Sequence, residues 1–212
     1  MKKTVLFLLV LVSICCVLPA KERTYVYSIG CFVYDKTCNN VDYFGPYFGS
    51  ETVNVDNNKS FSLGFYSSAN INVPLWSKSA NGTWTKNDFS DRTEFKMDFL
   101  LGIGTVLHAG SVIDFLIGFG LLGDYDFVLS NGLFSFDSNR FLKYDFIMGL
   151  GMDIDMLFKI SDSICVDLGV HTGYANWGYR ILETRYYSYT GEIEFDNRFM
   201  GVKAKIGLGI KR

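Results

Sequence analysis

The stretch MGVKAKIGLGI, residues 200–210, decides the fold class, because its apolar residues recur at every second position. A period of two belongs to a β-strand with one apolar face, since successive side chains of a strand point to opposite sides. One face carries Met200, Val202, Ala204, Ile206, Leu208 and Ile210, and the other carries Gly201, Lys203, Lys205, Gly207 and Gly209. The sequence therefore predicts a long amphipathic strand here.

Seven further segments show the same alternation, which brings the expected number of strands to eight. The weakest begins after Pro46, a residue that fits only at the start of a strand. The seven segments are residues 25–33, 47–55, 61–73, 94–104, 113–120, 143–153 and 163–171.

The connections between these strands alternate between long and short. We expect long loops at residues 35–44, 74–92, 123–139 and 173–197, and tight turns at 56–59, 107–110 and 154–157. Four long loops at one end and three turns at the other are typical of an outer-membrane barrel with both termini in the periplasm. The predicted fold is all-β, an eight-stranded antiparallel up-and-down transmembrane β-barrel.

Alternation alone does not say whether the apolar face points to lipid or into a cavity, because lipocalin-like secreted barrels also alternate. The second face favours lipid. It carries many glycines, such as Gly102, Gly118 and Gly149, which weaken a solvated strand but relieve crowding inside a narrow barrel. The Gly-x-Trp of lipocalins is missing near the expected mature N-terminus. A secreted ligand-binding barrel remains the second alternative.

The N-terminus has the order of a secretory signal peptide: Lys2 and Lys3, an apolar run over residues 5–18, then Pro19 and Ala20. The run is too short to span a bilayer as a helix, which needs about 20 residues. We expect residues 1–20 to be removed and residues 21–212 to form a single barrel domain.

The charge balance excludes one class of partner. Lys and Arg number 20 and Asp and Glu number 22, so the net charge of −2 offers no basic surface for nucleic acid.

The chain resembles the small eight-stranded bacterial outer-membrane proteins of the OmpX, OmpW and OmpA-barrel kind, including a spirochaetal variety. The resemblance rests on strand number, loop asymmetry and the amphipathic final strand over residues 199–210. It implies location in the bacterial outer membrane, with lipid and the barrel-assembly machinery as partners. One departure concerns the signal for that machinery, because the chain ends Ile210-Lys211-Arg212 without the usual final aromatic residue.

Charged residues on the inward face are the main candidate site. A barrel of eight strands is just wide enough to be filled by side chains, and charges buried there need partners. We expect a nearly balanced network that plugs the lumen, and the alternative is a narrow, porin-like path for small or apolar solutes. The network comprises Glu94, Lys96, Asp98, Asp114, Lys143, Asp145, Asp167, Lys203 and Lys205.

No catalytic motif is found, so we expect no enzyme, no cofactor and no metal. His171 lies where small barrel lipid A deacylases carry a His-x-Ser pair, but here Thr172 and Gly173 follow it. We interpret His171 as a lumen or rim residue. His108 lies in an expected turn with no second metal ligand nearby.

Three cysteines remain after removal of the signal peptide. Cys31 and Cys38 are close enough in the sequence to close a small loop in an oxidising compartment, so they are a candidate disulfide, with free thiols as the alternative. Cys165 is expected to be a small buried lumen residue.

The long loops are rich in aromatic residues, chiefly Trp84, Trp177, Tyr186, Tyr187 and Tyr189. Such residues form interfacial girdles at strand ends or, alternatively, a binding surface. Thr190 and Gly191 are expected to form a hairpin turn between strands that project past the membrane. A projecting edge offers strand addition to a host or extracellular protein. The sequence thus favours a structural or adhesin-like role at the cell surface.

Overall fold

The computed structural model describes residues 22–37, 42–55, 63–78, 82–87, 92–130, 142–184, 187–195 and 198–211. The predicted signal peptide lies outside these residues. No helix within the described part of the chain is long and apolar enough to cross a membrane. The eight long strands are β1 (Glu22–Thr37), β2 (Asp42–Val55), β3 (Gly64–Asn72), β6 (Arg92–Ala109), β7 (Ile113–Ser130), β8 (Leu142–Lys159), β9 (Ile164–Glu183) and β11 (Phe199–Lys211).

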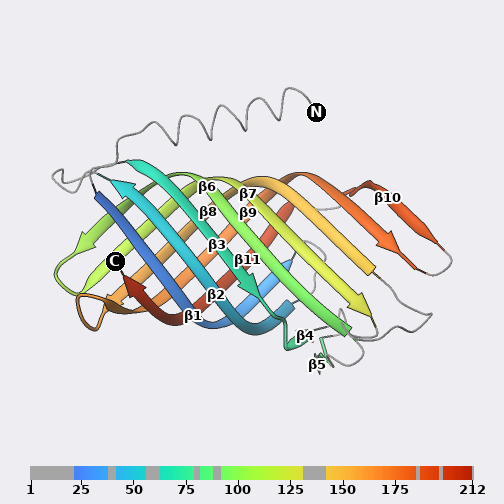
Figure 1. Ribbon diagram of the computed structural model, residues 1–212, viewed down its shortest axis with the longest axis horizontal. Helices are drawn as coiled ribbons and strands as arrows, with labels where there is room; N and C mark the ends of the chain where they lie inside the picture. Colours follow the sequence, from blue (N-terminus) through green and yellow to red (C-terminus); the bar gives the residue numbers. More distant parts are fainter. Residues whose placement is uncertain are drawn as a thin grey trace.

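The eight long strands close into a barrel, as predicted. Each pairs antiparallel with the next, and β1 pairs with both β2 and β11, which completes the ring. The strands are strongly tilted against the long axis of the molecule (Figure 1). Three short strands lie outside the ring: β4 (Trp76–Lys78) pairs with β2, β5 (Trp84–Lys86) with β4, and β10 (Ser188–Glu192) with β9.

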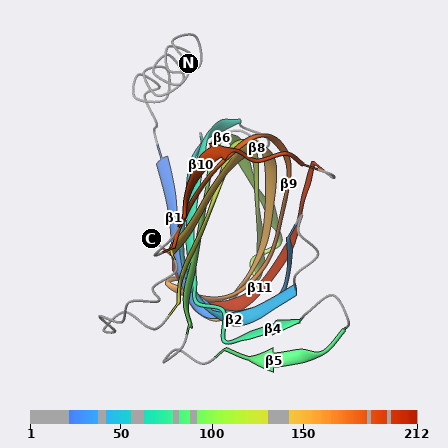
Figure 2. The same ribbon diagram turned by 90° about the vertical axis from the view of Figure 1, so that its right-hand side faces the viewer.

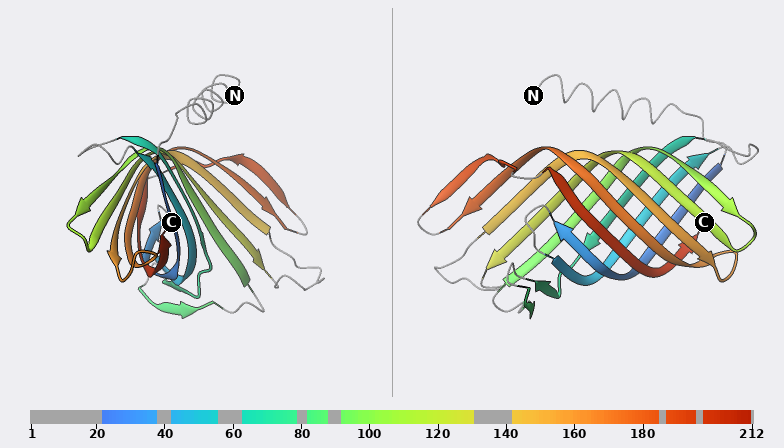
Figure 3. Two further views of the ribbon diagram at one scale, coloured as in Figure 1. Left: turned by 60° about the vertical axis from the view of Figure 1, so that its left-hand side comes forward. Right: turned by 180° about the vertical axis from the view of Figure 1, so that it is seen from behind.

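The two ends of the barrel differ. At one end, the loop end, β4 and β5 lie beside β2 outside the ring, and the β9–β10 hairpin reaches beyond the wall (Figures 2 and 3). At the opposite end, the turn end, β6 joins β7 through residues 110–112, and β8 joins β9 through residues 160–163. Gly110 permits the first turn, because its φ of 73° lies in the left-handed region.

Two predicted turns were misplaced. Residues 154–157 belong to β8, and β6 continues to Ala109, so both turns come later than expected. At the second turn, the cause is the polar inward face, because Asp155 and Leu157 continue the alternation of β8 and are both fully buried inside the barrel. Strands also fill much of the predicted loops, since β7 reaches Ser130 and β9 reaches Glu183.

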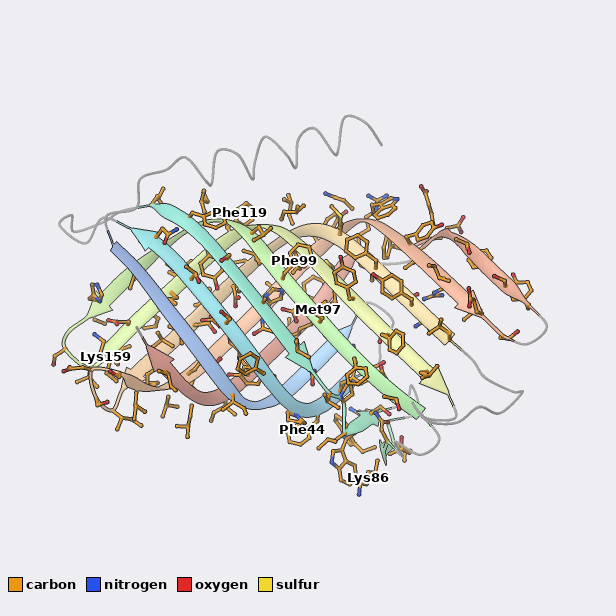
Figure 4. All side chains as sticks on the ribbon, viewed as in Figure 1. Phe44, Lys86, Met97, Phe99, Phe119 and Lys159 are labelled. Carbon is orange, nitrogen blue, oxygen red and sulfur yellow. The ribbon has the colours of Figure 1, made fainter. Side chains whose placement is uncertain are left out.

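The apolar face points outward. Ile103 and Leu208 are 57% and 58% exposed, whereas the inward Leu100 and Leu116 are completely buried. Met97, Phe99 and Phe119 stand on the outside of the wall in Figure 4. A barrel whose outer surface is apolar and whose polar groups lie inside is the arrangement that a lipid environment requires. It does not fit a secreted barrel with an apolar cavity.

Met200 is an exception to the predicted pattern. We expected it on the lipid face, but it is buried inside, because the β11–β9 register shifts between Phe199 and Gly201. Gly201 has a φ of 106°, which allows the bulge that turns Met200 inward. The expectation that glycines relieve crowding is confirmed at Tyr66, whose buried ring lies where a Cβ on Gly104 or Gly118 would be.

Candidate functional site

The most unusual group of charges lies deep in the barrel around Lys205. Its ammonium nitrogen forms ion pairs with Glu51 and with Asp155 Oδ1 at 2.8 Å, and lies 3.7 Å from Asp167 Oδ2. Asp153 is also buried and lies 3.6 Å from His171 Nδ1. We name Glu51, Asp153, Asp155 and Asp167, together with Lys205 and His171, the acidic cluster. Four carboxylates here face one ammonium and one imidazole.

Strands distant in the sequence build this cluster. Glu51 comes from β2, Asp153 and Asp155 from β8, Asp167 from β9 and Lys205 from β11. Two tyrosine hydroxyls donate to the acids: Tyr47 to Asp167 Oδ2 at 3.1 Å, and Tyr66 to Asp153 Oδ2 at 2.9 Å. Gly169 leaves the space that the group needs, since a Cβ there would overlap Asp155 and Lys205.

A second centre surrounds Lys203. Its ammonium donates to Asp98 Oδ2 and Asp124 Oδ2, both at 3.0 Å, and Asn70 donates to Asp98 Oδ1 at 2.9 Å. Lys96 lies nearby on β6, with its nitrogen 3.6 Å from the centre of the Tyr43 ring. Cation–π contacts of this kind compensate part of the cost of burying a lysine. This centre pairs cations and anions more evenly than the acidic cluster does.

The third and fourth centres lie at the ends of the barrel. Toward the loop end, Arg180 forms a bidentate pair with Asp145 at 2.6 and 2.7 Å. Lys143 lies 2.8 Å from Asp145 and 3.6 Å from Asp126. We name these four residues the rim cluster. At the turn end, the buried Asp114 contacts Lys159 at 2.7 Å and His108 at 2.6 Å.

The structure brings most of the nine predicted network residues into these centres. Glu94 is buried as well, on β6. Sequence reasoning omitted Glu51, Asp124, Asp153 and Asp155, which lie inside. The expected near balance of charge was therefore wrong in the middle of the barrel, where acids are in excess. An acidic residue at an inward position of the alternation could have identified them. Glu51 lies in a weakly predicted strand, Asp124 in a predicted loop and Asp155 in a predicted turn, so they were not recognised as inward residues.

Among the described residues, Glu51, Asp155 and Asp167 have the geometry to hold a cation. One carboxylate oxygen from each lies within 4.8 Å of the others, and oxygen ligands suit hard cations such as Ca²⁺. Lys205 already places its positive charge among these oxygens. The group is thus arranged around an ammonium ion rather than around a metal.

Aromatic residues form a band on the outside of β6 to β9. Phe99 contacts Tyr125 at 6.0 Å between ring centres, and Tyr125 stacks on Phe146 at 4.4 Å. Trp177 meets the edge of Phe146 at 5.9 Å and stacks with Tyr179 at 6.0 Å. We name these five residues the aromatic band. Its position on the outer wall favours the girdle interpretation of Trp177.

The other predicted aromatics lie apart from this band. Trp84 is on β5, and Tyr187 and Tyr189 lie in the β9–β10 hairpin, all exposed. Tyr186 lies outside the described residues. The predicted turn at Thr190 and Gly191 was wrong, because both residues are in β10. The hairpin closes earlier in the chain, where Thr184 N donates to Tyr187 O at 2.8 Å.

The cysteines are described only in part. Cys165 is buried, as expected. The candidate pair lies outside what the structure describes, since the chain at Cys38 and the side chain of Cys31 are not among the described parts.

Comparisons with known proteins bear on the fold. No protein-family model and no curated protein matches the sequence. Among solved structures, a major outer membrane protein from Thermus thermophilus is similar at 10% identity and a TM-score of 0.50, covering 90% of this chain and 100% of that chain. The chain has the fold of a bacterial outer-membrane β-barrel. With its apolar outer wall, it is a protein of the outer membrane.

Two further solved structures match with lower scores. Neisserial surface protein A has 10% identity and a TM-score of 0.46, over 90% of this chain and 98% of that one. Ail, the attachment invasion locus protein of Yersinia pestis, has 12% identity and a TM-score of 0.44, over 90% of this chain and 99% of that one.

Proposed function

We propose that this protein is a non-conducting outer-membrane barrel that acts at the cell surface through its loop end. The observation that carries the proposal is the filled interior, in which ion-paired side chains such as Lys203, Lys205 and Asp98 are almost completely buried. Charges locked in pairs leave no hydrated path for a solute. We assign no catalytic activity to the chain.

The β9–β10 hairpin supports an interaction role. β10 pairs with β9 along one edge, from Tyr179 to Glu183, and its residues are largely exposed. An edge strand that reaches beyond the barrel presents backbone groups to which an extended segment of another protein can add. We propose strand addition by an extracellular protein at this edge.

Cell adhesion tests this proposal. Cells that display the wild-type barrel should bind to an immobilised extracellular-matrix protein more than to albumin, and Tyr189→Lys should reduce binding, because a lysine on an edge strand disfavours strand pairing. Tyr187→Lys is the matched control, since Tyr187 lies in the turn and outside β10. Equal binding by the wild type and Tyr189→Lys would contradict the proposal.

The proposal also requires that the loop end faces outward. In a background without native cysteines, Ser188→Cys should react with a membrane-impermeant maleimide on intact cells. Asp162→Cys, at the turn end, should react only after the outer membrane is permeabilised. The reverse labelling would place the loop end in the periplasm and overturn the surface role.

One observation favours a second candidate function. The excess of acids around Lys205 would make any path through the barrel selective for cations. Purified barrel in planar bilayers should show no steady conductance if the lumen is plugged. A reproducible cation-selective conductance that Asp155→Asn or Asp167→Asn reduces would support the narrow conduit instead.

A further inference from the structure

The hairpin of β4 and β5 has two different faces. Strand register sets them: Phe44 of β2 pairs with Trp76, Trp76 pairs with Lys86, and Lys78 pairs with Trp84. Paired residues of antiparallel strands share one face of the sheet, and Phe44 is on the outward face of β2. Trp76, Lys78, Trp84 and Lys86 therefore form a single outward surface, which we name the Trp–Lys face.

The opposite face of the hairpin is small and polar and fixes the hairpin in place. Ser77 Oγ donates to Asn87 Oδ1 at 3.0 Å, and Asn87 Nδ2 donates to Pro74 O at 2.9 Å. A backbone bond from Leu75 N to Phe44 O at 2.9 Å holds the hairpin against β2, and one from Asn87 N to Leu75 O at 2.8 Å joins the two ends of the hairpin. The Trp–Lys face is thus held at a defined angle to the barrel wall.

The Trp–Lys face is exposed and carries two ammonium groups. Trp76 and Trp84 are 40% and 44% exposed. The Lys78 nitrogen lies 5.9 Å from the centre of the Trp84 ring. Residues 74–87 contain two lysines and no acidic residue, and Asp42 of β2 pairs with Lys78 at one edge of the face. An exposed pair of indoles beside two ammonium groups is costly in water alone, and it suits the boundary between hydrocarbon and charged headgroups.

The position of the hairpin matches that boundary. Phe44 and the band residue Phe99 lie at a similar place along the long axis of the molecule, on different parts of the outer wall (Figure 4). The outer face of β2 continues from Phe44 to Phe48, which is 53% exposed. The Trp–Lys face is therefore continuous with the lipid-facing surface, and its Lys86 lies nearer the loop end than Phe99 does (Figure 4).

We infer that the Trp–Lys face is a binding site for anionic lipid headgroups of the leaflet at the loop end. The indoles of Trp76 and Trp84 lie at the depth of the headgroups, and the ammonium groups of Lys78 and Lys86 bind headgroup phosphates. Only the identity of the leaflet depends on the proposed function, because the orientation of the barrel decides which side of the membrane the hairpin meets.

Tryptophan fluorescence tests the inference on the full barrel. The chain has three tryptophans, so Trp177→Phe leaves only those of the Trp–Lys face. In micelles of an uncharged detergent, short-chain phosphatidic acid should produce a saturable blue shift, and short-chain phosphatidylcholine should not. Lys78→Gln with Lys86→Gln should weaken apparent binding by about 25-fold, from about fivefold for each lysine at an anionic surface.

Matched variants and probes make each outcome decisive. Lys78→Arg with Lys86→Arg keeps the charge and should keep the response. In vesicles, phosphatidylcholine with brominated acyl chains should quench both indoles. An equal response to the two lipids, saturation by inorganic phosphate alone, or no quenching by brominated chains would overturn the inference. The adhesion assay depends on β10, so either proposal can fail without the other.

Discussion

The acidic cluster and the rim cluster both pair buried acids with cations, but in different proportions. Around Lys205, three carboxylates share one ammonium, and their side chains are almost fully buried. Around Asp145, two cations meet two acids, and the Arg180 side chain is 32% exposed. The rim cluster balances its own charge and has water nearby, whereas the acidic cluster depends on Lys205. The difference teaches that inward charges contribute to stability according to depth and local balance, not according to number.

The largest effect is expected at Lys205. Lys205→Met removes the ammonium and leaves Glu51, Asp155 and Asp167 buried without it. We expect a loss of about 3–5 kcal/mol in the free energy of unfolding, as for other broken buried pairs. Urea unfolding in vesicles, followed by the heat-dependent shift in gel mobility, measures this loss. A loss below about 1 kcal/mol, the range of exposed pairs, would remove the distinction between the two clusters.

An intermediate effect is expected at Lys203. Lys203→Met leaves Asp98 buried, but Asn70 still donates to it, so the remaining charge keeps one partner. We expect a loss of about 1–3 kcal/mol, the usual cost of a buried polar group that loses a partner. The same unfolding assay measures it, with Lys203→Arg as the control that keeps the charge. A loss as large as that of Lys205→Met would show that local balance is not what matters.

A smaller effect is expected at the rim. Arg180→Met removes the bidentate pair with Asp145, but Lys143 remains 2.8 Å from that carboxylate. We expect a loss of about 0.2–1 kcal/mol that shrinks further in high salt, because exposed pairs are screened. Unfolding at two salt concentrations measures both the loss of stability and its dependence on salt. A loss that does not change with salt would place this pair in a drier environment than its exposure indicates.

The smallest effect, of opposite sign, is expected at Asp155. Asp155→Asn removes one of the excess charges and keeps the side-chain shape, so repulsion with Glu51 and Asp167 falls. The free energy of unfolding should stay the same or rise, by up to about 1 kcal/mol. Asp145→Asn is the matched control in the balanced cluster and should lower it. A clear loss of stability in Asp155→Asn would show that all three acids are needed around Lys205.

The sequence predicted the strands well, because alternation is local and each strand displays it by itself. It predicted the inward position of Lys203, Lys205 and Asp167 for the same reason. It did not predict which charges meet, since Lys205 reaches residues of β2 and β8 that are brought near by the tilt and stagger of the closed barrel. Tilt and stagger are properties of the whole sheet, and no single strand displays them. Polar residues such as Asp155 were mistaken for a turn, because the inward residues of a strand that faces a polar interior resemble the polar residues of a turn.

The pairing of β1 with β11 has a consequence for the order of assembly. This seam joins residues from opposite ends of the chain, such as Val26 with Lys211 and Thr37 with Gly201. Contacts between residues so far apart form late, since the entropy of closing the intervening chain must be lost first. Until β11 is in place, β1 and β9 each present an open edge to other unfolded chains. The interval between export and closure is therefore the period in which this barrel most needs protection from aggregation.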